Sequence, residues 1–170
     1  METEKLFYQD AYLCETTAKV VECRKGKRGY EIVLDRTCFY PEGGGQPGDH
    51  GTLNGIPVVD TREKDGLVLH DTKEPIEVGT EVKAVIDWDR RFDLTQQHSG
   101  EHMVSGVVHR IYGYDNVGFH MGADMVTIDF SGELTEQQLR DVEQEVNERI
   151  WLDSPVKCWY PSPEELGEIP

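Results

Sequence analysis

The sequence predicts an α+β protein in which a small N-terminal β-barrel is followed by an α/β core with helices packed on an antiparallel sheet. Two observations support this class. Short runs of β-forming residues, separated by turn signals, fill the chain up to about Trp88. Beyond that point the apolar residues recur at helical spacing. We therefore expect two domains, a barrel over residues 1–88 and an α/β core over residues 89–170.

The first domain is expected to contain five main strands connected by tight turns. Asn54-Gly55 and Asp65-Gly66 have the composition of two-residue hairpin connections, because both central positions of such turns favour glycine, asparagine or aspartate. The regular spacing of these turns favours a small barrel. The strands are expected over residues 19–23, 30–34, 56–60, 67–70 and 81–87.

The second domain is expected to open with a helix over residues 91–112. Its apolar residues recur at i, i+3, i+4 and i+7 from Val104 to Ile111, and Gly113 is suited to end it. A strand over residues 125–130 follows. A second helix is expected over residues 136–151, with a capping box formed by Thr135 and Gln138. Its buried stripe should consist of Leu139, Val142, Val146 and Ile150.

Composition limits the function. The 170 residues include 33 acidic and 17 basic side chains, giving a net charge of −16. This balance disfavours general electrostatic binding of a polyanion, so any nucleic-acid contact must be local. Residues 24–28 are expected to form a solvated basic loop or, alternatively, a phosphate contact. No apolar run has the length of a membrane span and no hydrophobic signal segment is found, so we expect a cytoplasmic protein. The cysteines form no C-x-x-C pair and are expected to be free thiols: Cys14, Cys23, Cys38 and Cys158.

His98 and His102 are the most informative pair of residues. Two imidazoles four residues apart on a helix can bind one metal ion, although a catalytic zinc usually takes three protein ligands. The pair lies off the apolar face of its helix, which indicates either solvent-facing histidines or histidines lining a site. His109 is seven residues further on, about 10 Å along the axis, and cannot join the same metal. Ser99 occupies the position where a metalloprotease helix carries its glutamate, which argues against a protease.

Two glycines interrupt the same helix. Gly100 and Gly106 each cost about 1 kcal/mol of helix stability relative to alanine. Their presence is compatible with a close approach of another backbone at these positions. The alternative is that the glycines are tolerated in a helix that packing holds together.

Gly43, Gly44 and Gly45 follow an aromatic segment and precede Gln46. Such a loop can bring backbone N–H groups close to a ligand, whereas the simplest alternative is a tight turn. The loop lacks both the Gly-Lys-Ser/Thr ending of a P-loop and the G-x-G-x-x-G spacing of a dinucleotide fold, which disfavours a nucleoside triphosphate site.

Four motifs together resemble the alanyl-tRNA editing family, which comprises freestanding AlaX-type proteins and the editing domain of alanyl-tRNA synthetase. Their order and spacing match over essentially the whole chain. The resemblance implies a deacylase that hydrolyses tRNA(Ala) mischarged with serine, with glycine as a further candidate. It also implies a barrel followed by an editing core. The motifs are residues 34–47, 97–102, 118–122 and 127–130.

The same resemblance assigns roles to individual residues. It makes His98 and His102 two ligands of a zinc ion. The family's other two ligands, a cysteine and a histidine in a later segment, have no counterpart here, and Cys158 is read as structural or incidental. We therefore expect a truncated chain and a zinc that is absent, weakly held or completed from outside. Thr37 is a candidate for reading the serine hydroxyl. His120 and the loop from Gly43 to Gln46 are expected to line the pocket.

Glu101 and the overall function each have an alternative interpretation. Glu101 is a candidate base, and a solvated helix glutamate is the competing interpretation. The alternatives to a deacylase are a non-catalytic module that binds a nucleotide or tRNA end, and an inactive fragment of a longer synthetase-related protein. An unrelated zinc hydrolase is a third reading.

Overall fold

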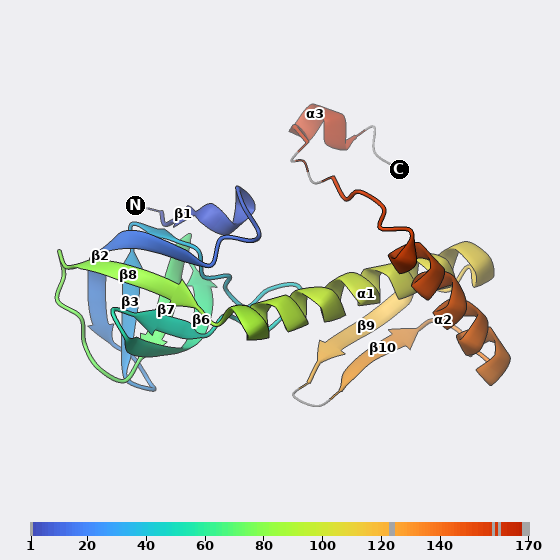
Figure 1. Ribbon diagram of the computed structural model, residues 1–170, viewed down its shortest axis with the longest axis horizontal. Coiled ribbons are helices and arrows are strands. Elements are labelled where there is room, and N and C mark those ends of the chain that lie inside the picture. Colours follow the sequence, from blue (N-terminus) through green and yellow to red (C-terminus); the bar gives the residue numbers. More distant parts are fainter. Residues whose placement is uncertain (1, 123–124, 158, 160, 168–170) are drawn as a thin grey trace.

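The structure, a computed structural model, describes residues 2–122, 125–157, 159 and 161–167. It is a mixed α and β fold with mostly antiparallel sheets. Figure 1 shows a group of strands at one end, from which a long helix leads to a hairpin and a second helix. None of the helices in this described part of the chain is both long and apolar enough to cross a membrane.

Six strands close into a barrel whose neighbouring strands all run antiparallel. The sequence expectation for residues 30–34 is confirmed. Three of the other strands begin earlier or extend further than predicted, and the strand expected over residues 81–87 ends one residue earlier. The two hairpin turns are confirmed as well, because Asn54, Gly55, Asp65 and Gly66 all have positive φ. In order around the barrel the strands are β2 (Glu15–Lys25), β3 (Tyr30–Leu34), β7 (Leu67–Thr72), β6 (Ile56–Lys64), β5 (Gly51–Leu53) and β8 (Glu81–Ile86).

The barrel interior is the larger of two hydrophobic cores. Alternating positions of the strands supply it, as the two-residue period of a strand requires. Outside the barrel, the short strands β1 (Glu4–Lys5) and β4 (Arg36–Thr37) pair in parallel, and a single helical turn, η1 (Leu6–Tyr8), follows β1. Elements of two or three residues have no sequence periodicity, so they were not predicted.

The long helix α1 (Trp88–Tyr112) carries the histidine pair. Asp87 caps its first turn, with the side chain accepting a hydrogen bond from the N–H of Arg90, so the helix begins three residues earlier than predicted. Gly113 ends it with a φ of 71°, as expected. Trp88 packs against the barrel core, so the first turn of α1 is part of both halves of the molecule.

The second half consists of α1, a hairpin and two further helices. The strands β9 (Asn116–Met121) and β10 (Val126–Phe130) form an antiparallel pair. Helix α2 (Glu136–Trp151) has the predicted bounds and the predicted capping box. A short helix, α3 (Pro163–Leu166), lies in the C-terminal segment. The second core joins α1, α2 and the hairpin through Val107, Val108, Val142, Val146 and Phe130.

The structure corrects one prediction about the helix surfaces and decides between two alternatives for the helix glycines. Ile111, Leu139 and Ile150 are exposed, because the two-stranded hairpin and one partner helix cover only the middle of each apolar stripe. Gly100 and Gly106 do not mark a close backbone approach. A methyl group built on either glycine would meet no atom within 4 Å, so both are defects that the helix tolerates. The division into domains 1–88 and 89–170 stays a prediction.

Candidate functional site

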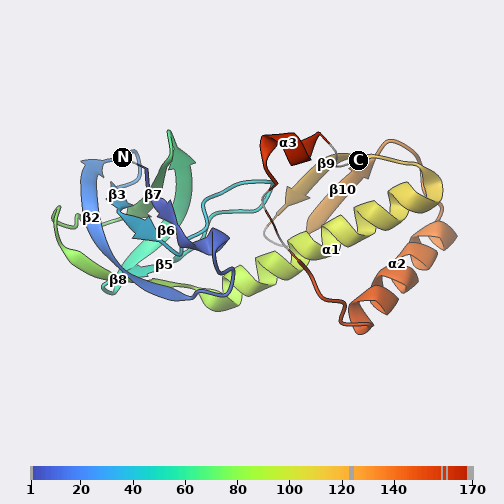
Figure 2. The same cartoon turned by 90° about the horizontal axis from the view of Figure 1, so that it is seen from above.

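A glycine turn projects from the barrel alongside α1, and Figure 2 shows the segment reaching toward the hairpin. Gly43 and Gln46 exchange two backbone hydrogen bonds, of 3.1 and 3.0 Å, around Gly44 and Gly45. These two central residues have φ values of 58° and 82°, a conformation that most side chains avoid. The tight-turn alternative for this loop is therefore correct.

The turn also makes a close approach that needs glycine. A methyl group on Gly44 would lie 3.5 Å from Cε1 of His98, and one on Gly45 would lie 2.6 Å from Cδ1 of Phe119. The position of Phe119 leaves no room for a side chain at Gly45, whereas a methyl group on Gly44 would be in ordinary contact with His98. The expectation that backbone N–H groups of this loop meet a ligand stays a prediction.

A buried ion pair fixes the base of this loop to α1. Arg91 donates to both carboxylate oxygens of Asp49, and to the carbonyl oxygen of Cys38 at 3.0 Å. The Asp49 carboxylate also accepts from the N–H of Tyr40, at 2.8 Å, and the Asp49 N–H donates to the Tyr40 carbonyl. Tyr40 and Asp49 flank the glycine turn, so these bonds hold both of its ends against the helix.

His98 lies between the turn, His102 and the hairpin. Its ring stacks on His102, with centroids 4.9 Å apart, and on Phe119, at 5.4 Å. Nδ1 lies 3.0 Å from Oε1 of Gln46; since an amide oxygen only accepts, Nδ1 carries the proton and Nε2 is left as a ligand atom. Burial, together with the neighbouring His102, lowers the pKa of His98, which favours the neutral form that binds metals.

His102 and Glu101 have opposite environments although they are adjacent. The His102 side chain is 73% exposed and that of Glu101 only 3%. Oε2 of Glu101 lies 3.3 Å from Nδ1 of His102, and Oε1 accepts from Ser105 Oγ at 2.5 Å and Asn116 Nδ2 at 2.6 Å. The interpretation of Glu101 as a solvated glutamate is therefore wrong, because Asn116 and Ser105 enclose it between α1 and β9.

The two histidines fit a metal ion as part of its ligand set. Ligand atoms of His98, Glu101 and His102 lie within 4.8 Å of one another, and no other such group occurs in the described ranges. Both oxygens of Glu101 already face other groups, which leaves the two imidazoles as the candidate ligands. A protein oxygen beside each Nδ1 is the usual support for a metal-binding histidine. Two nitrogens supply half of a tetrahedral zinc site. Cys158 lies outside the described residues.

Thr37 and His70 form a separate, fully buried pair in the barrel. His70 Nδ1 lies 2.9 Å from the carbonyl oxygen of Ile32, so this nitrogen carries the proton and Nε2 accepts from the Thr37 hydroxyl at 2.8 Å. The Thr37 oxygen in turn accepts from the N–H of Phe39. Burial lowers the pKa of His70 to about 4, so it is neutral. No local pattern marks His70 as a functional residue, because its partners come from strands distant in sequence.

The structure brings together some of the predicted site residues and not others. The glycine turn, Gln46 and the histidine pair form one cluster. His120 is exposed and alternates with Phe119 along β9, so the two side chains face opposite sides of the hairpin. Phe119 and Asn116 contact the cluster without having been predicted; their position in the 116–122 segment, opposite the histidine helix, was the only available signal.

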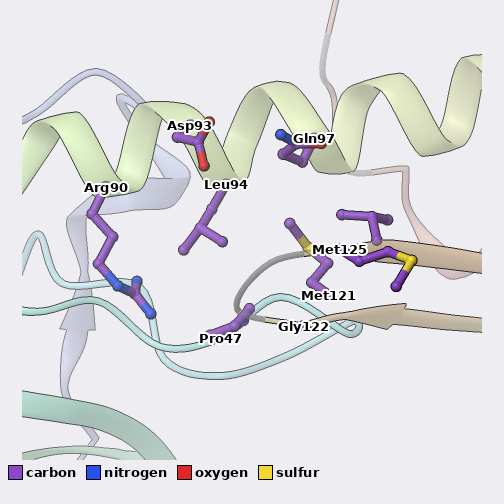
Figure 3. A pocket seen from close by; sticks show the side chains of 9 residues that line it. Pro47, Arg90, Asp93, Leu94, Gln97, Met121, Gly122 and Met125 are labelled. Carbon is purple, nitrogen blue, oxygen red and sulfur yellow. The ribbon is translucent and has the colours of Figure 1, made fainter.

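A hollow of about 560 Å³ adjoins this cluster, between the first half of α1 and the tip of the hairpin. Figure 3 shows Arg90 and Leu94 extending from α1 toward the segment at Pro47. Gln97 and Pro47, the sequence neighbours of His98 and Gln46, both line it. The lining is mixed apolar and polar: Pro47, Arg90, Asp93, Leu94, Gln97, Met121, Gly122, Met125 and Val126.

The fold and the site define a barrel-containing α+β protein with a candidate metal-binding histidine pair under a glycine turn. Residues 2–90 match the family model of class II (A) tRNA synthetases. The chain is 43% identical over 174 residues to the alanyl-tRNA editing protein AlaX-L of Pyrococcus horikoshii, covering 98% of this chain and 42% of that protein. It is 36% identical over 177 residues to AlaX-M of the same organism, covering 98% and 79%.

A mammalian relative matches as well. The alanyl-tRNA editing protein Aarsd1 of Bos taurus is 37% identical over 162 residues, covering 87% of this chain and 36% of that protein. The chain thus spans less than half the length of AlaX-L and Aarsd1. It belongs to the alanyl-tRNA editing family of the AlaX type, which confirms the resemblance seen in the sequence.

Proposed function

We propose that this chain hydrolyses the ester bond of tRNA(Ala) mischarged with serine, acting on a separate aminoacyl-tRNA, with glycine as a further candidate for the mischarged amino acid. The observation that carries the proposal is the histidine pair, each ring with an oxygen beside Nδ1, directly under the glycine turn. Three relatives bear the name of alanyl-tRNA editing proteins. The cytoplasm, where aminoacyl-tRNA is used, is the compartment that this activity requires.

The chemistry needs little assistance, because an aminoacyl ester is already activated. Hydrolysis requires a positioned water and stabilisation of the charge that develops on the carbonyl oxygen. The N–H groups of Gly44 and Gly45 are not used in the two hydrogen bonds of the turn, and they can donate to that oxygen. His98 and His102 would hold a zinc ion, which supplies an electrophile for the carbonyl or a water of lowered pKa when bound.

Selection of serine over alanine should depend on its hydroxyl group. A site that hydrogen-bonds a hydroxyl rejects the smaller analogue strongly, since its own polar groups are then left unpaired. Thr37 remains our candidate for this contact. Its hydroxyl proton is committed to His70, so toward a substrate Thr37 would accept a hydrogen bond. Because Thr37 is buried, this role requires the strand to open toward the site.

The hollow beside the cluster has the size and composition for the terminal nucleoside. Leu94, Met121 and Met125 offer apolar contacts for a base, and Arg90 and Asp93 offer polar ones for a ribose and its phosphate. Leu94→Trp, which fills the hollow, should raise KM for charged tRNA several-fold. An unchanged KM would place the nucleoside elsewhere.

The decisive experiment compares release of the amino acid from serine-charged and alanine-charged tRNA(Ala). We expect release of serine only. His102→Ala should lower the rate at least about 100-fold, more than the loss usually caused by removing a residue that merely supports a metal ligand. His109→Ala is the matched control, because His109 lies on the same helix, pairs with Asp115 at 3.0 Å and should leave the rate unchanged.

Two results would overturn the proposal. If charged tRNA binds without release of either amino acid, the chain is a non-catalytic binding module. If serine is released at the same rate by the His102→Ala variant, the histidine pair is not the site.

A further inference from the structure

Glu101 is the one acidic side chain of α1 that the structure buries. Its two oxygens have separate tasks. Oε1 accepts from Ser105 and Asn116, whereas Oε2 faces Nδ1 of His102 at 3.3 Å. Burying a carboxylate costs folding free energy unless its oxygens are hydrogen-bonded in this way, and here the buried group lies beside an exposed histidine.

We propose that Glu101 is a positioning residue that holds the proton of His102 on Nδ1 and thereby keeps Nε2 available to a metal ion. The proposal rests on the metal-binding role that the proposed function gives to the histidine pair. A neutral imidazole carries one proton, and an anionic oxygen 3.3 Å from Nδ1 favours that proton on Nδ1. Without the carboxylate, both tautomers of this exposed ring are open.

This role replaces the candidate role of Glu101 as a base. A general base must reach the proton that it abstracts, within hydrogen-bond distance or through one water. The Glu101 side chain is 3% exposed, and each of its oxygens already faces a protein group. For the same reason it is a poor direct ligand, because binding a metal would break the contacts to Ser105 and Asn116 or to His102.

The contacts of Glu101 extend to the hairpin. Asn116 is the first residue of β9. Besides donating to Glu101, its side-chain Nδ2 donates to Ser105 Oγ at 3.1 Å, and its side-chain Oδ1 accepts from the N–H of Gly118. Phe119, three residues further along β9, stacks on His98. One strand therefore supports both histidines, His98 through Phe119 and His102 through Asn116 and Glu101.

Glu101→Gln tests this assignment with almost no change in shape. The single amide oxygen should stay with the two donors, Ser105 and Asn116, which turns the NH₂ group toward Nδ1 of His102. That group can only donate, so the proton of His102 should move to Nε2 and block the ligand atom. We expect the affinity for Zn²⁺ and Co²⁺ to fall about 10–100-fold.

Two measurements read the effect without an activity assay. Competition with a chelator gives the dissociation constants for Zn²⁺ and Co²⁺, and ¹⁵N NMR of the imidazole rings in metal-free protein identifies the protonated nitrogen of His102. Glu143→Gln is the control for the change in charge, because Glu143 is an exposed residue of α2. Unchanged affinity, or a proton that stays on Nδ1 in Glu101→Gln, would overturn the proposal.

A double-mutant cycle tests whether Glu101 binds the metal ion directly. In a His102→Ala background, Glu101→Gln should cause no further loss of metal affinity, because its effect passes through the missing ring. An additional loss of tenfold or more would make Glu101 a ligand itself and contradict the positioning role. If Glu101→Gln does not fold, Asn116→Ala loosens the same carboxylate; a smaller, several-fold loss of affinity is expected, and no loss would contradict the proposal.

The outcomes also separate this proposal from the proposed function. One outcome would refute the editing function and keep the positioning role: the wild-type protein releases no serine, but the Glu101→Gln variant shows the tautomer change. Serine-specific release with an unaltered tautomer and metal affinity in Glu101→Gln would do the reverse.

Discussion

The neutral state of His70 follows from its surroundings. The ring is enclosed by the barrel, donates to the Ile32 carbonyl and accepts from Thr37, and it forms a T-shaped pair with the ring of Phe39. Adding a proton would place a charge in an apolar interior and leave the Thr37 hydroxyl facing a second donor. This is the physical cause of its low pKa.

His70 should make the protein less stable in mild acid. Its pKa is about 4 in the fold and 6.5 when unfolded, so the unfolded chain takes up the proton first as the pH falls. Its contribution is full above about pH 6.5 and is lost between there and pH 4, at most about 3 kcal/mol. The stability advantage of wild type over His70→Gln, from urea unfolding, should therefore narrow across this range. An advantage that stays constant across this range would contradict the prediction.

Gly45 offers a residue-scale test of the turn. Gly45→Ala would place a methyl group 2.6 Å from Phe119, at a φ of 82°. Gly55→Ala at the β5–β6 turn has almost the same φ, 83°, and no atom within 4 Å. Both pay for the strained backbone, but only Gly45→Ala displaces the turn from His98. We expect a loss of deacylation of at least about tenfold, as misplacement of a catalytic group produces, for Gly45→Ala, and less than about twofold for Gly55→Ala. Equal losses would show that only the backbone matters.

At the scale of elements, α1 is longer and less well covered than its apolar pattern suggests. Its two internal glycines face open space, whereas Gly113 adopts a left-handed conformation at its end. Gly106→Ala should raise the free energy of unfolding by about 0.5–1 kcal/mol, because it removes backbone freedom from the unfolded chain without a clash.

Gly113→Ala is the matched control for Gly106→Ala. It also meets no atom within 4 Å, but its φ of 71° disfavours a side chain, so it should destabilise by about 1 kcal/mol. Urea unfolding of the two variants gives both values. A destabilising Gly106→Ala would mean that an approach to the helix occurs in solution.

For the whole molecule, the ion pair between Arg91 and Asp49 is the main polar connection between the barrel loop and α1. Arg91→Ala would leave Asp49 buried without its charged partner and should cost about 3–5 kcal/mol. Arg110→Ala on the same helix removes an exposed pair with Glu145 and should cost less than about 1 kcal/mol. Denaturant unfolding measures both; similar small losses would show that the two halves are held together by apolar packing alone.

The net charge of the molecule predicts the strength and the salt dependence of its binding to tRNA. The net charge is −16, and ten of the 17 lysine and arginine side chains form ion pairs with carboxylates within the described residues, which reduces the number available to neutralise phosphates. Binding of this chain to tRNA(Ala) should be weak, with a slope of log Kd against log salt of no more than about 3, because each phosphate contact contributes a little under one. Anisotropy titrations between 50 and 300 mM salt measure the slope. Tight binding with a steep slope would contradict this prediction.

The local elements were largely readable from the sequence. Residues 30–34 and 136–151, the turns at Asn54 and Asp65, and the end of α1 at Gly113 depend on periodicity, capping and φ preferences, which act over a few residues. The histidine pair was recognisable for the same reason, since a four-residue spacing on a helix is a local property. Family membership followed from motifs that are each short and local.

Tertiary structure decided between the alternatives for Glu101 and for the glycines of α1. Glu101 is enclosed because Asn116, from a different element, donates to its carboxylate. Gly44 and Gly45 form a turn that also lies against His98 and Phe119. His70 and Arg91 acquired their partners from strands and loops 33 to 53 residues away in sequence. Sequence periodicity reports which face of an element is apolar, whereas the partner of a buried polar group depends on long-range packing that no local pattern encodes.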